Sequence, residues 1–120
     1  VLNASDGTNN NRLHVFIDGS NGFTTTREIV AGVQQGNCAF TISQKTNIRA
    51  SFAYSSAGVT ASGNASVPTV GNNATHPTGI NKLSLGSGVA GTGSFLNGYI
   101  AKCAFYPQRL ISAELQAFSK

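Results

Sequence analysis

Apolar and polar residues alternate along much of this chain, and the alternation predicts short β-strands. In residues 12–17, Leu13, Val15 and Ile17 fall on one face of an extended segment. The same pattern predicts strands at residues 23–30, 38–44, 47–55, 59–62 and 82–85. In the strand at 47–55 the apolar face consists of Ile48, Ala50, Phe52 and Tyr54.

Small and polar residues separate these predicted strands. Asp18 and Gly19 begin a segment that suits a tight hairpin turn. A calcium loop beginning at Asp18 would need a glutamate eleven residues later, where Ile29 stands, so a turn is favoured. Residues 65–79 form a long loop rich in Asn, Thr and Pro, and residues 86–93 form a bend. Residues 1–11 lack periodicity and are predicted to be an arm or linker.

The last quarter of the chain holds its densest apolar content. Residues 99–106 are predicted to form the final strand, which Pro107 ends because it has no N–H to donate. Strict alternation would divide the apolar residues between two faces. A β-bulge near residues 101–102 is favoured instead, because it turns Ile100, Cys103 and Phe105 toward the core.

A short helix follows this predicted strand. Ser112 is a candidate N-cap, and Glu114 lies in the first turn. Ile111, Leu115 and Phe118 form one apolar stripe, by which so short a helix must dock on the rest of the protein. Together these elements predict an all-β antiparallel sandwich with one short C-terminal helix.

The run GSFLNGYIAKCAFYPQRLISAELQAF resembles the C-terminal end of concanavalin A-like, laminin-G-type jelly-roll domains. It looks most like those at the ends of bacteriophage tail fibres, tailspikes and other virion appendages. The resemblance is carried by residues 82–88 and 112–117 and by Phe95, Gly98, Ile100, Cys103 (usually a larger aliphatic), Phe105, Tyr106, Pro107 and Leu110. It is close over residues 80–120 and only rhythmic over residues 12–80.

The resemblance implies a jelly roll spanning residues 12–120 as one domain, the C-terminal part of a longer protein. It implies location in a virion, or otherwise outside the cell. The partners it implies are a bacterial cell-surface polysaccharide or another host receptor, together with other virion proteins or further copies in a trimer. Such folds host lectins, hydrolases and scaffolds, so the fold alone does not choose a function.

Composition adds few constraints. Charged residues make up 10% of the chain, and the net charge of +4 reflects the presence of only four acids. A sparsely charged β surface is favoured over one that attracts anionic partners, and no nucleic-acid partner is expected. No apolar segment reaches membrane length, so membrane insertion is not expected. Cys38 and Cys103 are interpreted as two buried thiols in preference to a disulfide.

Residues suited to catalysis or metal binding do not form a recognisable pattern. His14 is expected on the exposed face of its strand, and neither it nor His76 belongs to a recognisable Ser-His-Asp set. Glycosidases of this fold carry clustered acids on one strand, and this chain has no such cluster. A non-catalytic protein without metal or cofactor is therefore expected.

Sugar binding uses aromatic faces together with planar amide and guanidinium donors. The candidate ligand-binding residues of those types are Arg27, Arg49, Tyr54, Asn72, Asn73, His76 and Tyr99. Tyr106 is expected to pack in the core. The leading hypothesis is a carbohydrate- or receptor-binding jelly roll of a phage appendage. The alternatives are a structural or oligomerisation module of a virion and a carbohydrate-binding module of a secreted glycoside-active enzyme.

Overall fold

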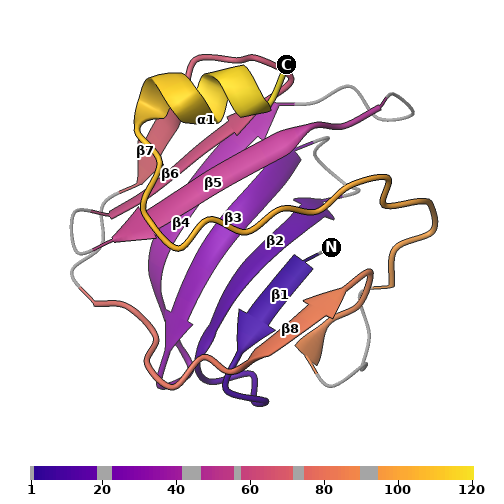
Figure 1. The fold of residues 1–120 in the computed structure, drawn as a ribbon. Helices are drawn as coiled ribbons and strands as arrows, with labels where there is room; N and C mark the ends of the chain where they lie inside the picture. Colours follow the sequence, from indigo (N-terminus) through magenta and orange to yellow (C-terminus); the bar gives the residue numbers. More distant parts are fainter. Residues whose placement is uncertain (1, 19–22, 42–46, 56–57, 72–74, 90–94) are drawn as a thin grey trace.

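The computed structural model describes residues 2–18, 23–41, 47–55, 58–71, 75–89 and 95–120. These residues form two antiparallel sheets and one short helix, which confirms the expected all-β class (Figure 1). The five-stranded sheet has the order β4-β3-β2-β1-β8, and the three-stranded sheet has the order β5-β6-β7. The elements are β1 (Leu2–Ser5), β2 (Arg12–Asp18), β3 (Phe23–Val30), β4 (Val33–Thr41), β5 (Ala50–Ser55), β6 (Gly58–Gly63), β7 (Thr69–Gly71), β8 (Lys82–Leu85) and α1 (Ser112–Phe118).

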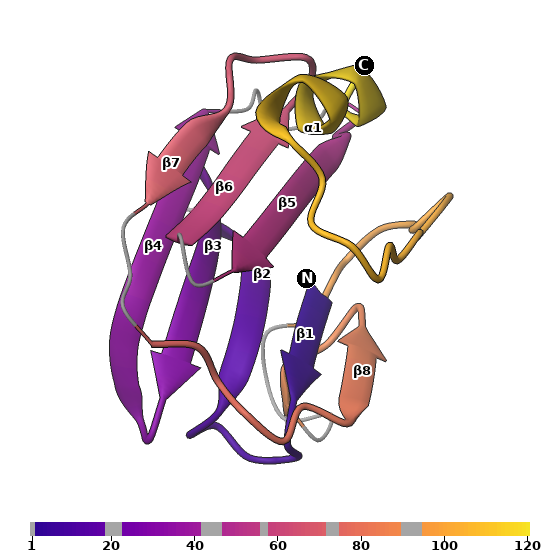
Figure 2. The same cartoon turned by 60° about the vertical axis from the view of Figure 1, so that its left-hand side comes forward.

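The small sheet covers only one side of the large one, over β4 and β3 (Figure 2). The core between the sheets consists of Cys38, Phe40, Val59 and Ala61, with Ile17, Ile48 and Phe52 packed around it. Two glycines allow the close approach. A Cβ atom on Gly63 would lie 1.9 Å from the Phe40 ring, and one on Gly71 would lie 2.1 Å from the carbonyl oxygen of Asn37.

The strand register confirms the face predicted for β2. Directly paired residues of an antiparallel sheet share a face, and Val15 pairs with Leu2 on one side and Thr26 on the other. Thr26 pairs in turn with Cys38 of the core, so Leu13, Val15 and Ile17 face the small sheet. The bounds of β3 and β8 also match those predicted, whereas β4 begins earlier, at Val33.

The N-terminal residues differ from the prediction of an arm or linker. Leu2–Ser5 form β1, which pairs with β2 on one side and β8 on the other. The two buried side chains of β1, Asn3 and Ser5, lie on the outer face of the sheet and are polar. The sequence of β1 therefore lacks the alternation of apolar residues that would have predicted a strand. The Asn3 amide, with its oxygen toward Val89, accepts from the Val89 N–H (3.0 Å) and donates to the Leu13 carbonyl (3.2 Å). The predicted loop at 65–79 likewise contains a strand, β7.

The predicted final strand is also wrong. Residues 99–106 form no strand, and Ile100, Cys103 and Phe105 are exposed instead of facing a core. We call residues 95–111 the strap. Figure 1 shows the strap running past the free edge of β5 before it rises to α1. Strand-forming residue types did not suffice here, because a strand also needs a partner for its backbone groups.

The C-terminal helix is present, but its start differs from the prediction. Ile111, not Ser112, occupies the N-cap position, and the Glu114 carboxylate accepts from its N–H at 2.9 Å. Leu115 is fully buried, whereas Ile111 and Phe118 are mostly exposed. The predicted apolar stripe therefore docks through Leu115 alone.

Hydroxyl and amide groups complete the docking of α1 on the outer face of the small sheet. The Ser51 hydroxyl donates to the Leu115 carbonyl at 2.6 Å, and the Ser62 and Ser119 hydroxyls lie 2.9 Å apart. The Gln116 amide donates to the Ala65 carbonyl at 2.9 Å. The helix was predicted to dock through apolar side chains only. In the structure, hydrogen bonds supply part of its attachment to the small sheet.

Candidate functional site

Glu28 of β3 and His76, from the segment between β7 and β8, form an ion-pair geometry. Glu28 lies on the inward face of β3, where it pairs with Leu13 of β2 and Gly36 of β4. The pairing of β3 with β4 shifts register between Glu28 and Ile29. Such β-bulges change the direction of side chains and are common next to active sites. His76 comes from the segment between β7 and β8, and its Nδ1 lies 2.9 Å from Glu28 Oε1.

Burial dominates the electrostatics of this pair. The Glu28 side chain has no exposed surface, and its burial raises the pKa of the carboxyl, while the hydrogen bond and charge of His76 lower it in part. Among the described residues, Oε2 has no hydrogen-bond partner. When the carboxylate is ionised, His76 Nδ1–H donates to it, and this bond fixes the orientation of the imidazole.

Tyr54 completes the cluster from β5. Its ring centroid lies 6.0 Å from that of His76, with the planes inclined at 57°. Tyr54 is 38% exposed, and the His76 side chain is 21% exposed, so both rings meet solvent. Pro77, which is buried, restricts the backbone of His76 to extended conformations. An anchored imidazole and a tyrosine ring therefore share one partly open site.

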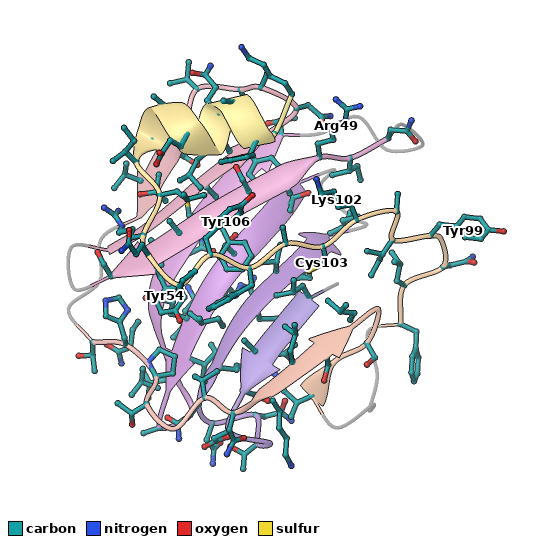
Figure 3. The ribbon with its side chains drawn as sticks, in the orientation of Figure 1. Arg49, Tyr54, Tyr99, Lys102, Cys103 and Tyr106 are labelled. Atoms are coloured by element: carbon teal, nitrogen blue, oxygen red, sulfur yellow. The ribbon has the colours of Figure 1, made fainter. Side chains whose placement is uncertain are left out.

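The other predicted ligand-binding residues do not join this site. Figure 3 shows Arg49 and Tyr99 in regions of the molecule well separated from Tyr54. The Arg49 guanidinium donates to the main-chain oxygen of Lys120, and Tyr99 is fully exposed on the strap. Asn72 and Asn73 lie outside the described residues.

Arg27 lies on the opposite face of the large sheet from Glu28. Its guanidinium carbon stands 4.6 Å from the centre of the Phe16 ring. His14, the direct partner of Arg27 across β2 and β3, has its ring 4.7 Å from that of Phe16. Burial, then the charges of Arg12 and Arg27, lower the pKa of His14 to about 4. The prediction of an exposed strand histidine is thus corrected to a half-buried one.

Both cysteine thiols are free. Cys38 is buried in the core, as predicted, and its Sγ lies 2.8 Å from the Thr69 carbonyl oxygen. Cys103 is exposed on the strap, which contradicts the prediction of a second buried thiol. Within the described ranges, His, Cys, Asp and Glu side chains form no group of three or more that could hold a metal ion.

Comparison with known proteins finds no match to a family model, to a curated protein or to a solved structure. In the part of the chain that the structure describes, the one helix is far too short to cross a membrane. The arrangement of the side chains is therefore what bears on function.

Sequence reasoning selected Tyr54 and His76 but missed Glu28, Arg12 and His14 as members of clusters. Thr24, Thr26 and Glu28 occupy alternating positions, so the sequence could have predicted a polar face on the strand at residues 23–30. Its partner is 48 positions away, and only the packing brings the two together.

Proposed function

We propose that this chain is a non-catalytic carbohydrate- or receptor-binding β-sandwich of the jelly-roll type, from a phage tail fibre, tailspike or similar virion appendage. The observation that carries the binding function is the cluster of Tyr54 and His76, with His76 oriented by Glu28. A sugar ring can stack on the tyrosine and contact the exposed part of the His76 ring, whose Nδ1 is held by Glu28 and whose Nε2 is enclosed. Jelly-roll type and virion location rest on the resemblance of residues 80–120.

The burial of Glu28 favours binding over catalysis. Hydrolysis of a glycosidic bond uses two carboxyl groups that flank the bond. Glu28 is enclosed and directed at His76, so its role is to hold the imidazole in place. Asp6 is engaged in its own turn, where it accepts hydrogen bonds from Thr8 and Asn11.

A glycan array probed with the labelled protein tests the binding proposal. Tyr54→Ala and His76→Ala are each expected to lower binding about tenfold, since each removes a ring contact worth roughly 1.4 kcal/mol. Tyr99→Ala is the matched control, because it removes the same side chain from the strap. Binding that depends on Tyr99 and not on Tyr54 would refute this site. No retention of any glycan or host cell would refute the function.

A second candidate function, assembly, is favoured by the surface of the strap. Phe95, Tyr99 and Phe105 are each more than two-thirds exposed. Exposed apolar side chains gathered on one segment are typical of surfaces that bury against another protein chain. A structural module that packs strap to strap in a homotrimer accounts for them.

Sedimentation equilibrium tests the assembly candidate. If the strap mediates self-association, the wild type forms trimers, and Phe105→Ser shifts the equilibrium to monomer. Val67→Ser, an exposed apolar residue outside the strap, serves as the control and leaves the mass unchanged. A monomeric wild type up to high concentration would exclude self-assembly through the strap.

A further inference from the structure

Three nitrogen-bearing side chains gather on the outer face of β2 and β3, away from the small sheet. His14 and Arg27 are direct cross-strand partners, and Arg12 pairs with Ile29 in the adjacent register. Arg12 and Arg27 are therefore diagonal neighbours on one face, within reach of each other's long side chains. The location of this pair of strands is seen in Figure 1.

Among the side chains that the structure describes, no acid forms an ion pair with Arg12 or Arg27. Among the described residues the only ion pair is that of Glu28 with His76, and it lies on the other side of the sheet. The Nε atoms of Arg12 and Arg27 and the Nε2 atom of His14 are enclosed, and within the described chain they have no hydrogen-bond partner. The Arg12 guanidinium donates from an Nη atom to the Asn9 amide oxygen. Enclosed nitrogen donors without acceptors carry a desolvation cost that an anion can offset.

The aromatic ring beneath the cluster orients it. Phe16 packs against the Arg27 guanidinium at 4.6 Å and against the His14 ring at 4.7 Å. A guanidinium lying over a ring uses its face for that contact, so its N–H groups point along the ring plane toward acceptors at its edge. All three donor side chains are half-buried, so an ion pair formed there is less screened than one on an open surface.

We propose that Arg12, His14 and Arg27 form a binding site for an oxyanion group, namely a carboxylate, phosphate or sulfate. Two arginine forks in diagonal register suit the oxygens of such a group, because guanidinium binds oxyanions in bidentate geometry. The group can belong to a free anion or to an acidic saccharide. This site is separate from the Tyr54–His76 cluster, since it lies on the opposite face of the large sheet.

Nuclear magnetic resonance of the full chain tests the site through the arginine Nε–Hε signals. Sodium sulfate, sodium phosphate and a trigalacturonate oligosaccharide are titrated separately at constant ionic strength, with a neutral trigalactoside as control. Saturable shifts at Arg12 and Arg27, with none at Arg49 and Arg109, are expected. Linear shifts of all four arginines, or no shift at any, would overturn the proposal.

Tighter binding of trigalacturonate than of both inorganic ions identifies an acidic saccharide as the source of the oxyanion group, and the reverse identifies a free anion.

The His14 ring provides an independent readout of the same site. A bound anion favours the imidazolium form, so saturating sulfate raises the pKa of His14 above its value of about 4. An unchanged His14 titration in the presence of an anion that shifts the arginine signals would place that anion elsewhere and overturn the proposal.

Variants separate the charge from the geometry. Arg27→Gln is expected to weaken anion binding about tenfold, and Arg27→Lys to restore only part of it because the fork is lost. Arg109→Gln is the matched control, since Arg109 donates to Thr60 on the small sheet. Equal affinity in Arg27→Gln and Arg109→Gln would overturn the assignment. If Arg27→Gln fails to fold, His14→Gln with the wild-type titration provides the decision.

Discussion

The two halves of the large sheet differ in how they are covered. Over β3 and β4 the small sheet packs closely, and side chains such as Val59 and Ala61 are fully buried. At the β8 end, Leu83 and Leu85 remain about half exposed, although they continue the same inward face. The strap is strongly apolar, yet it is exposed. Apolar content alone therefore does not create a core. A core forms where a second sheet, with its own backbone groups paired, packs on the first.

The closest contact of the covered half offers the largest test. Gly63→Ala places a methyl group 1.9 Å from the Phe40 ring and is expected to destabilise the protein by about 3 kcal/mol. Gly98→Ala in the strap is the control. Its added Cβ meets nothing closer than 3.9 Å, so its effect on the urea midpoint should be small. Equal effects would show that the strap around Gly98 is packed as closely as the covered half of the sheet.

Leu115 tests whether the helix belongs to the covered half. Leu115→Ala removes a fully buried side chain, and a loss of roughly 2 to 3 kcal/mol in the free energy of unfolding is expected. Phe118→Ala removes a larger ring that is 55% exposed and stacked on Tyr106 at 5.2 Å, so a loss of about 1 kcal/mol is expected. The reverse order in thermal denaturation would mean that α1 docks through its other face.

Glu28 tests the electrostatic consequence of being covered. Because the pKa of Glu28 is raised in the folded protein, the native state holds its proton more tightly than the unfolded chain. Stability of the wild type should therefore fall as pH rises from 4.5 through the raised pKa, and Glu28→Gln should remove this fall. Chemical denaturation at a series of pH values measures it.

His76→Gln is the companion variant for this pH series. It removes the charge that lowers the pKa of Glu28 in part, so the total fall in stability should become larger and extend to higher pH. Parallel pH profiles for the wild type and Glu28→Gln would contradict the assignment of a buried carboxyl.

The smallest effect is expected in the exposed strap. Phe105→Ala truncates a side chain that is 77% exposed, and the loss of stability in the monomer should be about 0.5 kcal/mol or less. A loss comparable to that of Leu115→Ala would show that the strap is packed in solution.

Periodicity predicted faces well and partners poorly. The bounds of β3 and β8, the inward face of β2 and the presence of a C-terminal helix all follow from local patterns. The pairing of Leu2–Ser5 does not, because its buried positions are polar and are satisfied by distant backbone groups. Residues 99–106 show the converse, since they have strand-forming side chains without a neighbour to pair with.

The candidate site shows the same division. Tyr54 and His76 could be selected because their side chains suit sugar recognition, and the structure places their rings together. Glu28 could not be assigned to them from the sequence, because its role depends on the segment after β7 returning across β3. Arg27 was selected by type, while its neighbours Arg12 and His14 required the register of two strands.

The order of strands in the large sheet bears on how the chain reaches this structure. β1 to β4 are joined as successive hairpins, whereas β8 must return from late in the chain to pair with β1. Closing so long a loop is slow relative to forming local hairpins. We expect amide protection during refolding to appear first in β2 to β4 and last in β8. A chain emerging from the ribosome would thus form the antiparallel meander of β1 to β4 before β8 pairs with β1.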